Sequence, residues 1–577
     1  MSLLPNDTEL QFPHQITIPA SAGSGKTYTL SHRYVQFLLS PKIKSNGLRH
    51  ILAITFTKLA AKEMKERIVT LLKGAALGDQ RALEELTALV SLSSEDIRIR
   101  SEQLVNEILH NYSDFNIRTI DSFLTTVFKA SSLEMGVQPN VGIQFDNDAV
   151  IDQAFRLYSQ NLREGSADEQ FIDDLISLIE SNEGTSGGYL WNPFTKIVRE
   201  VRQLQREFGR YSMKPVIIEG AVPLSALKEK ITAAGQKLAV MLNDSTLPVN
   251  SYFLKDVKRL AEGDVLPVAS KGKTKKYFNK YSDDAGAAKE IKRLFAVITP
   301  MEKDLEQYIS VYAHTYYQPF VRAVNLIEQT VREVKALEGT IVIDDINRSL
   351  SRYLSNDVIP EVYLKLGERI AHFMIDEFQD TSPIQWRNLT PLIEEALSTS
   401  GSLFAVGDTK QSIYGFRGAD WHIFRDLIDR KYFPSAPASS LPLLVNYRSA
   451  QALVDFVKDV FSVNVAAAGL EELASASGLY NFAQDVPDAE KNKGYVEIQR
   501  IENKSDDDPV SDPERGYILS TIRDCISRGY SYGDIAILTP ANADVVEISS
   551  WLNSEKIPFL SLSTLDIRKR KIIGEII

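Results

Sequence analysis

The sequence predicts an α/β protein: a parallel sheet that carries a phosphate-binding loop, a large helical insertion, and the beginning of a second α/β domain. Three observations lead to this fold class. An apolar strand at residues 16–18 runs into a glycine-rich loop and a helix. Further apolar strands at 50–57 and 370–375 end in polar turns. Between them, from about residue 128 to 341, the chain has helical periodicity. Strands that alternate with helices are typical of parallel α/β sheets.

Composition limits the class of protein. A chain of 577 residues is too long for one hydrophobic core, so we expect about three domains. Hydrophobic residues make up 44% and charged residues 24%, an ordinary globular composition. The net charge of −11 disfavours a generally basic nucleic-acid coat but leaves room for a local basic track. A single cysteine, Cys525, the lack of a membrane-length apolar run, and the lack of a secretory pattern at residues 1–11 predict a cytoplasmic protein with no membrane partner.

The glycine-rich stretch at residues 20–27, Ala-Ser-Ala-Gly-Ser-Gly-Lys-Thr, has the composition of a phosphate-binding loop. Small residues let backbone N–H groups approach a phosphate closely, and the helix that follows directs its positive end at the anion. Ala20 stands where the pattern G-x-x-x-x-G-K-[ST] has its first glycine, and it is small enough to turn there. A chance Gly/Ser turn is the alternative interpretation. The expected nucleotide ligands are Ala22, Gly23, Ser24, Gly25, Lys26 and Thr27, with the Thr27 hydroxyl also binding Mg²⁺.

Two further strands end at what should be the same edge of the sheet. Phe56 and Thr57 close the strand at 50–57, and a strand that contains Thr119 runs into a polar turn. Open α/β sheets bind their ligands at the carboxyl ends of the strands. By position alone, the simpler interpretation of Phe56 is a core aromatic.

The stretch from 128 to 341 predicts an inserted helical domain. Inside it, residues 270–281 interleave five lysines with three aromatic residues, a combination that offers charge to phosphates and flat rings to bases. A solvated lysine loop explains the same residues equally well. The expected helices span 148–162, 168–179, 193–208, 224–242 and 287–327, the last with a break at Pro300.

The strand at 370–375 leads directly into Asp376 and Glu377. An ATPase needs such a pair after its phosphate loop, because one carboxylate holds Mg²⁺ and the other orients and deprotonates the attacking water. Adjacent acids in a turn are usually only solvated, but these follow a buried strand in a chain with a phosphate loop. We therefore expect Asp376 to bind the metal and Glu377 to be the catalytic base.

A second polar loop follows the apolar residues 403–406. It collects Gln411, Tyr414, Phe416 and Arg417 within a few positions. Amide, aromatic and cationic groups so close together suit a loop that contacts a nucleotide at one end and a base or phosphate at the other. A purely structural loop is the alternative.

From residue 441 onward the sequence predicts a second α/β domain. The alternation reaches residue 577 before it can complete a sheet, so we expect this domain to be incomplete. The block Asn-Tyr-Arg-Ser at 446–449 follows its first strand. The expected strands are 441–445, 495–501, 534–539 and 557–560, with helices at 452–461 and ending near 552.

Taken in order, these blocks resemble superfamily 1 helicases of the UvrD/Rep type, and within them the helicase subunits of the bacterial RecBCD and AddAB helicase–nucleases. The resemblance spans residues 20–449, with weaker similarity at 534–558. The carrying blocks are Ala-Ser-Ala-Gly-Ser-Gly-Lys-Thr, Thr-Phe-Thr with Ala-Ala-Lys-Glu-Met, Thr-Ile-Asp-Ser-Phe, Asp-Glu-Phe-Gln-Asp-Thr, Val-Gly-Asp-Thr-Lys-Gln-Ser-Ile-Tyr-Gly-Phe-Arg-Gly-Ala and Asn-Tyr-Arg-Ser. The implied domains are a RecA-like P-loop domain in two parts, 1–127 and 342–440, a helical insertion at 128–341, and the start of a second RecA-like domain at 441–577.

The resemblance also implies roles for single residues. Asp376 would be the Mg²⁺ carboxylate and Glu377 the general base. Gln411 would sense the γ-phosphate of ATP, Arg448 would stabilise the transferred phosphoryl group as an arginine finger, and Tyr447 would stack on adenine. Single-stranded DNA would lie against Phe56, Thr57, Thr119, Tyr414, Phe416 and Arg417.

The chain departs from the family pattern at four points. No adenine-reading glutamine stands in the usual context, although Gln11 and Gln15 are candidates. Asp121 replaces a commoner histidine. The later Thr-x-His-x-x-Lys-Gly-Leu-Glu and Thr-Arg-Ala blocks are missing, and so is the nuclease domain of the RecB and AddA subunits. These absences suggest truncation, so we expect ATP and Mg²⁺ binding to persist and strand separation by these residues alone to be weak or absent.

The predicted function is ATP-dependent translocation on single-stranded DNA, 3′ to 5′, in a repair and recombination system of the RecBCD/AddAB kind. The predicted partners are single-stranded or duplex-end DNA and a second helicase–nuclease subunit. The alternative is a non-motor scaffold of helicase-like fold that binds DNA or a partner without turning over ATP. Retention of Lys26, Asp376 and Glu377 disfavours the scaffold. An ATPase unrelated to DNA would have no use for the aromatic loop after Gln411.

Overall fold

A computed structural model provides the structure of the chain. It describes residues 4–138, 140–144, 147–183, 193–210, 224–245, 247–272, 277–278, 285–354, 370–468, 470–479, 484–500 and 513–561. The chain divides into two compact units, Met1–Asn492 and Lys493–Ile577. Within the described ranges, no helix is both long and apolar enough to cross a membrane.

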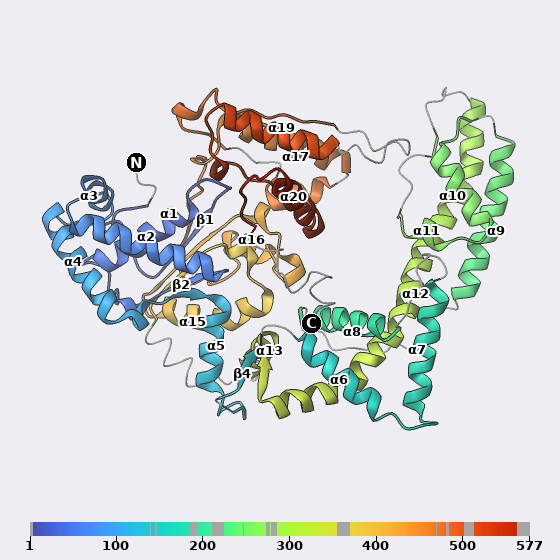
Figure 1. Ribbon diagram of the computed structural model, residues 1–577, viewed down its shortest axis with the longest axis horizontal. Coiled ribbons are helices and arrows are strands. Elements are labelled where there is room, and N and C mark those ends of the chain that lie inside the picture. Colours follow the sequence, from blue (N-terminus) through green and yellow to red (C-terminus); the bar gives the residue numbers. More distant parts are fainter. Residues whose placement is uncertain are drawn as a thin grey trace. The chain divides into compact units, whose positions relative to one another are not determined.

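A six-stranded parallel sheet forms the centre of the first unit (Figure 1). The strand order is β3-β2-β6-β7-β1-β8, and each neighbouring pair is parallel. The α/β class and the parallel sheet predicted from the sequence are therefore confirmed. The strands are β1 (His14–Pro19), β2 (Ile51–Thr55), β3 (Ile117–Thr119), β6 (His372–Ile375), β7 (Ser402–Gly407) and β8 (Ala438–Ser440).

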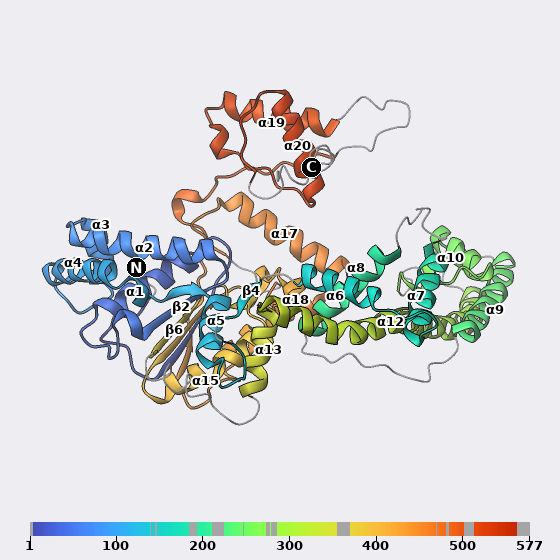
Figure 2. The same cartoon turned by 60° about the horizontal axis from the view of Figure 1, so that its bottom comes forward.

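Helices cover both faces of this sheet. In β2, Ile51 and Ala53 enter one hydrophobic core, whereas Leu52 and Ile54 enter the core on the opposite face. Because both faces are covered, β2, β6 and β7 are buried along their whole length, and this is why they appear in the sequence as continuous apolar runs. Figure 2 shows α1 to α4 on one side of the strands and α15 on the other. The first core contains α1 (Lys26–Leu39), α2 (Lys58–Ala76), α3 (Gln80–Thr87) and α4 (Ser94–His110); the second contains α5 (Ile120–Ser131), α13 (Ile343–Leu354), α15 (Pro383–Ser398) and α16 (His422–Ile428).

The residues between β3 and β6 form the predicted helices, in two further cores. The longest helix, α12 (Ala285–Glu338), contains Pro300 and Pro319 and continues through both, so the predicted break at Pro300 is wrong. A proline inside a helix costs about 3 kcal/mol. Packing offsets this cost, because α12 supplies Ile298 and Met301 to one core and Phe320 to the other. The other helices in the described part of this region are α6 (Asp148–Gln160), α7 (Ala167–Glu183), α8 (Pro193–Arg210), α9 (Leu224–Asn243), α10 (Ser251–Ala261) and α11 (Leu266–Ala269).

A two-stranded parallel sheet joins the two ends of this helical region, and the sequence did not predict it. In this sheet β4 (Gly142–Gln144) pairs with β5 (Thr340–Val342). Next to it, Asp345 accepts hydrogen bonds from Lys335 and Arg348. Although burial opposes it, the charges of these two cations hold the pKa of Asp345 below its ordinary value. The chain therefore leaves and re-enters the main sheet domain at one place.

The C-terminal part departs most from the sequence prediction. The strand expected at 441–445 is replaced by β8, and Leu443 makes only an isolated bridge to Ala20. The expected helix is present as α17 (Gln451–Ala468) and is followed by α18 (Glu471–Ser477). In the second unit, α19 (Pro513–Ser527) and α20 (Asn542–Ser554) pack through a small core. No strand is assigned to the described residues 493–500, 535–539 or 557–561, so the three strands predicted there are wrong.

Gly401, just before β7, is closely surrounded by backbone atoms of its neighbours. Its N–H donates to the carbonyl of Ala396 at 2.7 Å, and a Cβ added to it would collide with the carbonyl oxygens of Ala371 and Ala396. We predict that Gly401→Ala lowers the free energy of unfolding by about 1–3 kcal/mol, because backbone atoms must shift. Urea unfolding followed by circular dichroism measures this. Gly415→Ala is the control, since a Cβ there meets open space, and equal stability of the two variants would contradict the prediction.

Candidate active site

The phosphate loop joins β1 to α1 at the carboxyl edge of the sheet. Gly23 and Gly25 have φ angles of +74° and +89°, in the left-handed region where glycine is favoured. Ser24 Oγ donates to the carbonyl of Ser21 at 2.7 Å and holds the turn closed. The loop thus has the backbone conformation that its glycines were expected to permit.

A segment distant in the sequence lies directly against this loop. The N–H of Tyr447 donates to the carbonyl of Gly23 at 2.9 Å. Asn446 Oδ1 accepts the N–H groups of Arg448 and Ser449, at 2.9 Å each, which shapes the turn. A Cβ on Gly23 would stand 2.8 Å from Arg448 Cβ. The structure therefore places the predicted adenine and arginine-finger residues beside the predicted phosphate loop.

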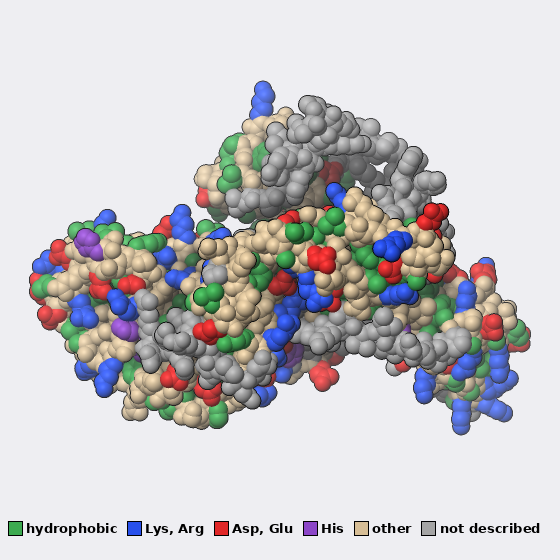
Figure 3. Space-filling view, turned by 90° about the horizontal axis from the view of Figure 1, so that it is seen from below, with side chains coloured by type: hydrophobic (Ala, Val, Ile, Leu, Met, Phe, Trp, Pro, Cys, Tyr) green, Lys and Arg blue, Asp and Glu red, His purple; other side chains and the backbone are tan. Residues whose placement is uncertain are grey.

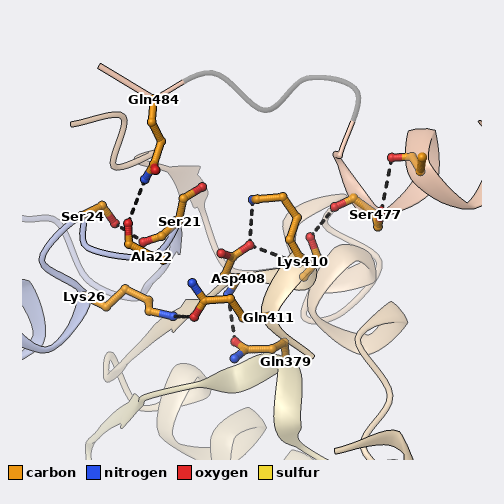
Figure 4. A network of polar contacts seen from close by, with 12 residues as sticks. Ser21, Ala22, Ser24, Lys26, Gln379, Asp408, Lys410, Gln411, Ser477 and Gln484 are labelled. Atoms are coloured by element: carbon orange, nitrogen blue, oxygen red, sulfur yellow. Dashed lines mark hydrogen bonds and ion pairs between the residues drawn. The ribbon is translucent and has the colours of Figure 1, made fainter. Parts of the chain in front are cut away.

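Gln484 also contacts the loop, although no sequence motif predicted it. Its Nε2 donates to the carbonyl of Ala22 at 3.1 Å (Figure 4). Its Oε1 accepts Asn446 Nδ2 at 3.1 Å. It lies outside every motif block, so only its contacts identify it.

The side chain of Lys26 joins three separate elements. It is 9% exposed, and its Nζ donates to Glu377 Oε2 at 2.9 Å and to Gln411 Oε1 at 2.8 Å. Lys26 begins α1, Glu377 follows β6, and Gln411 ends the short helix η4 (Thr409–Gln411) after β7. Figure 4 shows the contact between Lys26 and Gln411. The structure thus brings together three residues that belong to three separate sequence motifs.

Of the acidic pair, Asp376 is buried and Glu377 is partly exposed, and the turn that carries them is conformationally constrained. Glu377 has φ +47°, a left-handed backbone that costs a non-glycine residue roughly 1–3 kcal/mol, and its N–H donates to Asp376 Oδ1 at 3.0 Å. Asp376 is 4% exposed, and burial raises its pKa to about 7, with a further contribution from the Glu377 charge and opposition from Lys26. Asp380 behaves similarly, because burial and the Glu377 charge raise its pKa to about 7.

The predicted DNA-facing aromatic residues form one cluster. The rings of Phe56 and Tyr414 are 4.7 Å apart, and those of Tyr414 and Phe416 are 5.8 Å apart. The Arg417 guanidinium lies 5.5 Å from the Tyr414 ring and 5.8 Å from the Phe416 ring. Phe416 is 64% exposed, and Phe56 is partly exposed and belongs to neither core of the sheet domain. The interpretation of Phe56 as a core aromatic is therefore wrong.

The two threonines predicted to face DNA cap helices. Thr57 accepts the N–H of Ala60 at 3.1 Å at the start of α2, and Thr119 accepts the N–H of Ser122 at 3.2 Å at the start of α5. Both therefore lie at carboxyl ends of strands, as expected, and their side-chain oxygens have a structural partner.

Asp121, Gln15 and Gln11, where the chain departs from the family pattern, lie in three different environments. Asp121 accepts Gln385 Nε2 at 2.8 Å, and burial raises its pKa. Gln15 is buried within β1, whereas Gln11 is exposed.

The lysine-rich stretch at 270–281 is only partly described. Tyr277 packs edge-on against the rings of Phe253 and Phe295, and Phe278 is buried. Phe278 belongs to a hydrophobic core and Tyr277 is partly buried against it, so the base-stacking interpretation is wrong for these two residues. Lys273, Lys275, Lys276, Lys280 and Tyr281 lie outside the described residues.

Basic side chains do gather nearby on the helical region. Figure 3 shows them over the region of α9 and α10. The chain as a whole is acidic, so this group of lysines is a local departure from its net charge. Its exposed members include Lys228, Lys230, Lys237, Lys255 and Lys258.

The residues of the site fit a nucleoside triphosphate with Mg²⁺. The glycine loop stands at the positive end of α1, where anions are favoured. Lys26 supplies a buried ammonium, and Arg448 an exposed guanidinium. The Asp376 carboxylate and the Thr27 hydroxyl provide the hard oxygen ligands that Mg²⁺ prefers.

Fold and site together define a P-loop nucleotide-binding protein, and comparison with known proteins narrows the class. The sequence model of the UvrD/REP helicase N-terminal domain matches residues 7–431, and that of the UvrD-like helicase C-terminal domain matches residues 441–577. The chain therefore belongs to the UvrD/REP helicase family, as the sequence blocks predicted.

Similar proteins include helicase–nuclease subunits. An ATP-dependent helicase/nuclease subunit from Leuconostoc mesenteroides is 23% identical over 94% of this chain and 47% of its own length. The protein of the same name from Lactococcus lactis subsp. lactis is 26% identical with the same coverage. The exonuclease/helicase subunit RexA of Lactococcus lactis subsp. cremoris is 25% identical, again over 94% and 47%. The chain thus spans about half the length of the curated relatives it matches.

The pKa of Asp376 gives a pH-dependent prediction. In the folded state the pKa is raised from 3.8 to about 7, so ionising this buried group lowers stability progressively between about pH 4 and 7. Asp376→Asn removes that cost. In EDTA, the stability of the variant relative to the parent chain should rise with pH across this range and then level off. Urea unfolding between pH 4.5 and 8 checks it.

Asp345→Asn is the matched control, with the opposite sign. Its pKa is lowered, so the ionised carboxylate contributes stability above the unfolded pKa, and that contribution is lost only as pH falls through the lower folded pKa. The Asp345→Asn variant should be less stable than the parent chain by an amount that stays constant from about pH 5 to 8. A pH-independent difference for Asp376→Asn would contradict the assignment.

Proposed function

We propose that the chain is the ATP-hydrolysing motor region of a DNA helicase or translocase that moves 3′ to 5′ on single-stranded DNA. The observation that carries this proposal is the joint contact of Lys26 with Glu377 and Gln411. It gathers a phosphate-binding cation, a candidate base and a candidate phosphate sensor within hydrogen-bond distance. Membership of the UvrD/REP helicase family supports the same function.

Each residue then has a defined task in hydrolysis. ATP, with Mg²⁺ to neutralise its phosphate charge, supplies the phosphoryl group that is transferred to water. The loop residues Ala22 to Gly25 would bind phosphate through backbone N–H groups, and Lys26 through its charge. Thr27 and Asp376 would hold the metal. The Glu377 carboxylate would orient the attacking water and accept its proton.

The remaining polar residues act from the second loop and from the adjacent segment. Gln411 would donate its Nε2 to a phosphate oxygen next to Lys26, whose Nζ already donates to Gln411 Oε1. Arg448 would neutralise charge on the transferred group, and Tyr447, which is 69% exposed, offers its ring to adenine.

The DNA track would follow the carboxyl edge of the sheet. Phe56, Tyr414 and Phe416 offer ring faces and Arg417 a cation, while Thr57 and Thr119 lie at the ends of neighbouring strands. The basic surface of α9 and α10 suits the phosphates of duplex-end DNA. We assign residues 1–127 and 342–440 to the motor domain, 128–341 to the helical insertion and 441–577 to the second motor domain.

The cellular setting is proposed from the relatives. Proteins named as helicase/nuclease or exonuclease/helicase subunits match the chain over nearly all of its length. We therefore place it in a RecBCD/AddAB-like repair and recombination system, where its partner would be a second helicase–nuclease subunit. The match covers about half of each relative, so we expect strand separation by these 577 residues alone to be weak or absent.

Hydrolysis is tested at Glu377. Loss of a general base lowers turnover by roughly 100-fold or more, so Glu377→Gln should abolish most of the oligonucleotide-stimulated phosphate release. Its affinity for a non-hydrolysable ATP analogue should stay close to that of the parent chain, which excludes misfolding. An unchanged rate in the variant would refute the role. A parent chain that binds both the analogue and the oligonucleotide but releases no phosphate would favour the scaffold alternative.

The DNA track is tested at Phe416. A base stacked on an aromatic side chain contributes roughly 1–3 kcal/mol, so Phe416→Ala should weaken binding of an oligo(dT) strand by about tenfold. Fluorescence anisotropy at low salt measures the affinity. Tyr112→Ala is the control. Tyr112 is 58% exposed, but it precedes β3 and so lies at the amino ends of the strands, away from the carboxyl ends where the track is proposed. Equal affinity of the two variants would exclude this track.

A further inference from the structure

The side chain of Gln379 contacts both the acidic turn and the second polar loop. It lies in the short helix η3 (Phe378–Asp380) after β6 and is 1% exposed. Its Nε2 donates to Glu377 Oε2 at 2.8 Å, and its Oε1 accepts the backbone N–H of Asp408 at 2.8 Å. One planar amide therefore uses its donor and its acceptor on two different motifs. Figure 4 shows Gln379 beside Asp408.

The fold makes room for this amide at the end of β7. A Cβ on Gly407 would stand 2.8 Å from Gln379 Oε1 and 2.9 Å from the Phe424 ring, so only glycine leaves the space. Ser412 Oγ also donates to the Gln379 carbonyl at 3.2 Å. The second loop is thus attached to residue 379 at both Asp408 and Ser412.

These hydrogen bonds close a circuit around the candidate catalytic base. Glu377 Oε2 accepts both Lys26 Nζ and Gln379 Nε2. Lys26 continues to Gln411, whose N–H donates to the carbonyl of Asp408 at 3.0 Å, and the N–H of Asp408 returns to Gln379. The loop that closes the circuit continues into the exposed aromatic cluster, three residues beyond Gln411.

We propose that Gln379 is a positioning residue that couples the aromatic loop to the Glu377 carboxylate, so that a single strand on the loop sets the orientation of the base. The proposal rests on the function proposed above. Its physical basis is that Gln379 and Asp408 are almost fully buried, so that an unpaired amide group there is costly, whereas the Glu377 side chain is 33% exposed and can change its orientation. A shift of the loop at Asp408 therefore moves the Gln379 amide. This movement changes the hydrogen bond that Gln379 Nε2 donates to Glu377.

Two single substitutions, each made in the whole 577-residue chain, separate the two side-chain contacts of Gln379. Gln379→Glu keeps an acceptor for the Asp408 N–H but sets a carboxylate against Glu377. Gln379→Met keeps the volume of the side chain and removes both hydrogen bonds. The measurement is the Kd of a fluorescent non-hydrolysable ATP analogue with Mg²⁺, with and without saturating oligo(dT). The ratio of the two values reports coupling without requiring turnover.

We expect oligo(dT) to change the Kd of the analogue about fivefold or more in the parent chain, and this change to fall close to one in both variants. The Kd without oligo(dT) should stay within about threefold of the parent value, because Gln379 does not bind nucleotide. In steady-state assays the variants should lose oligo(dT)-stimulated kcat while KM for ATP is retained, a split that a purely structural defect would not give.

Gln385→Glu is the matched control, since Gln385 is a buried amide that contacts Asp121 and caps α15 but does not touch Glu377. It should lower the melting temperature and keep the coupling. Coupling that survives in the Gln379 variants, that is lost equally in Gln385→Glu, or that is missing from the parent chain would overturn the proposal. Failure of the proposed function looks different, because Lys26→Ala would then bind the analogue as tightly as the parent chain does.

Discussion

The charge of Lys26 is the constraint on which the rest of the site depends. A nearly buried ammonium must have acceptors, because an unpaired charge away from water is strongly unfavourable. Glu377 and Gln411 supply them, one after β6 and the other after β7. The contact can form only if β6, β7 and β1 lie side by side and end at the same edge, and their parallel registers provide this.

The requirement that β6, β7 and β1 lie side by side also bears on how the chain accommodates a long helical insertion. Strands β1 to β3 precede the insertion and β6 to β8 follow it, yet the sheet interleaves the two sets. Neither part can form the sheet alone, since β6 fills the place between β2 and β7. The small β4–β5 sheet brings the ends of the insertion together, so for the sheet domain the insertion is one long loop, whose entropic cost grows only slowly with length.

The features that the sequence predicted are those with local signals. The glycine loop, the Asp-Glu turn, the apolar central strands and most helices of the insertion each depend on residues that are neighbours in the chain. The missed features depend on distant partners. Gln484 lies outside every motif block, and Gln379 lies inside one, but the contacts of both are visible only in the structure. Phe56 likewise proves to lie outside the core only when the structure places Tyr414 beside it. Local rules also misjudged Pro300, where packing on two cores outweighs the cost of a proline, and the C-terminal strands, where alternation alone did not supply a partner.

We expect Lys26 to exchange its two protein acceptors, Glu377 and Gln411, for the phosphates of ATP. A crystal structure of the chain with Mg²⁺ and a non-hydrolysable ATP analogue tests it most directly. We expect a triphosphate on residues 22–27, with Lys26 Nζ on a phosphate oxygen, Asp376 at the metal, and Glu377 released from Lys26 while still bound to Gln379. A triphosphate bound elsewhere, or a Lys26–Glu377 contact kept at 2.9 Å beside bound nucleotide, would contradict it.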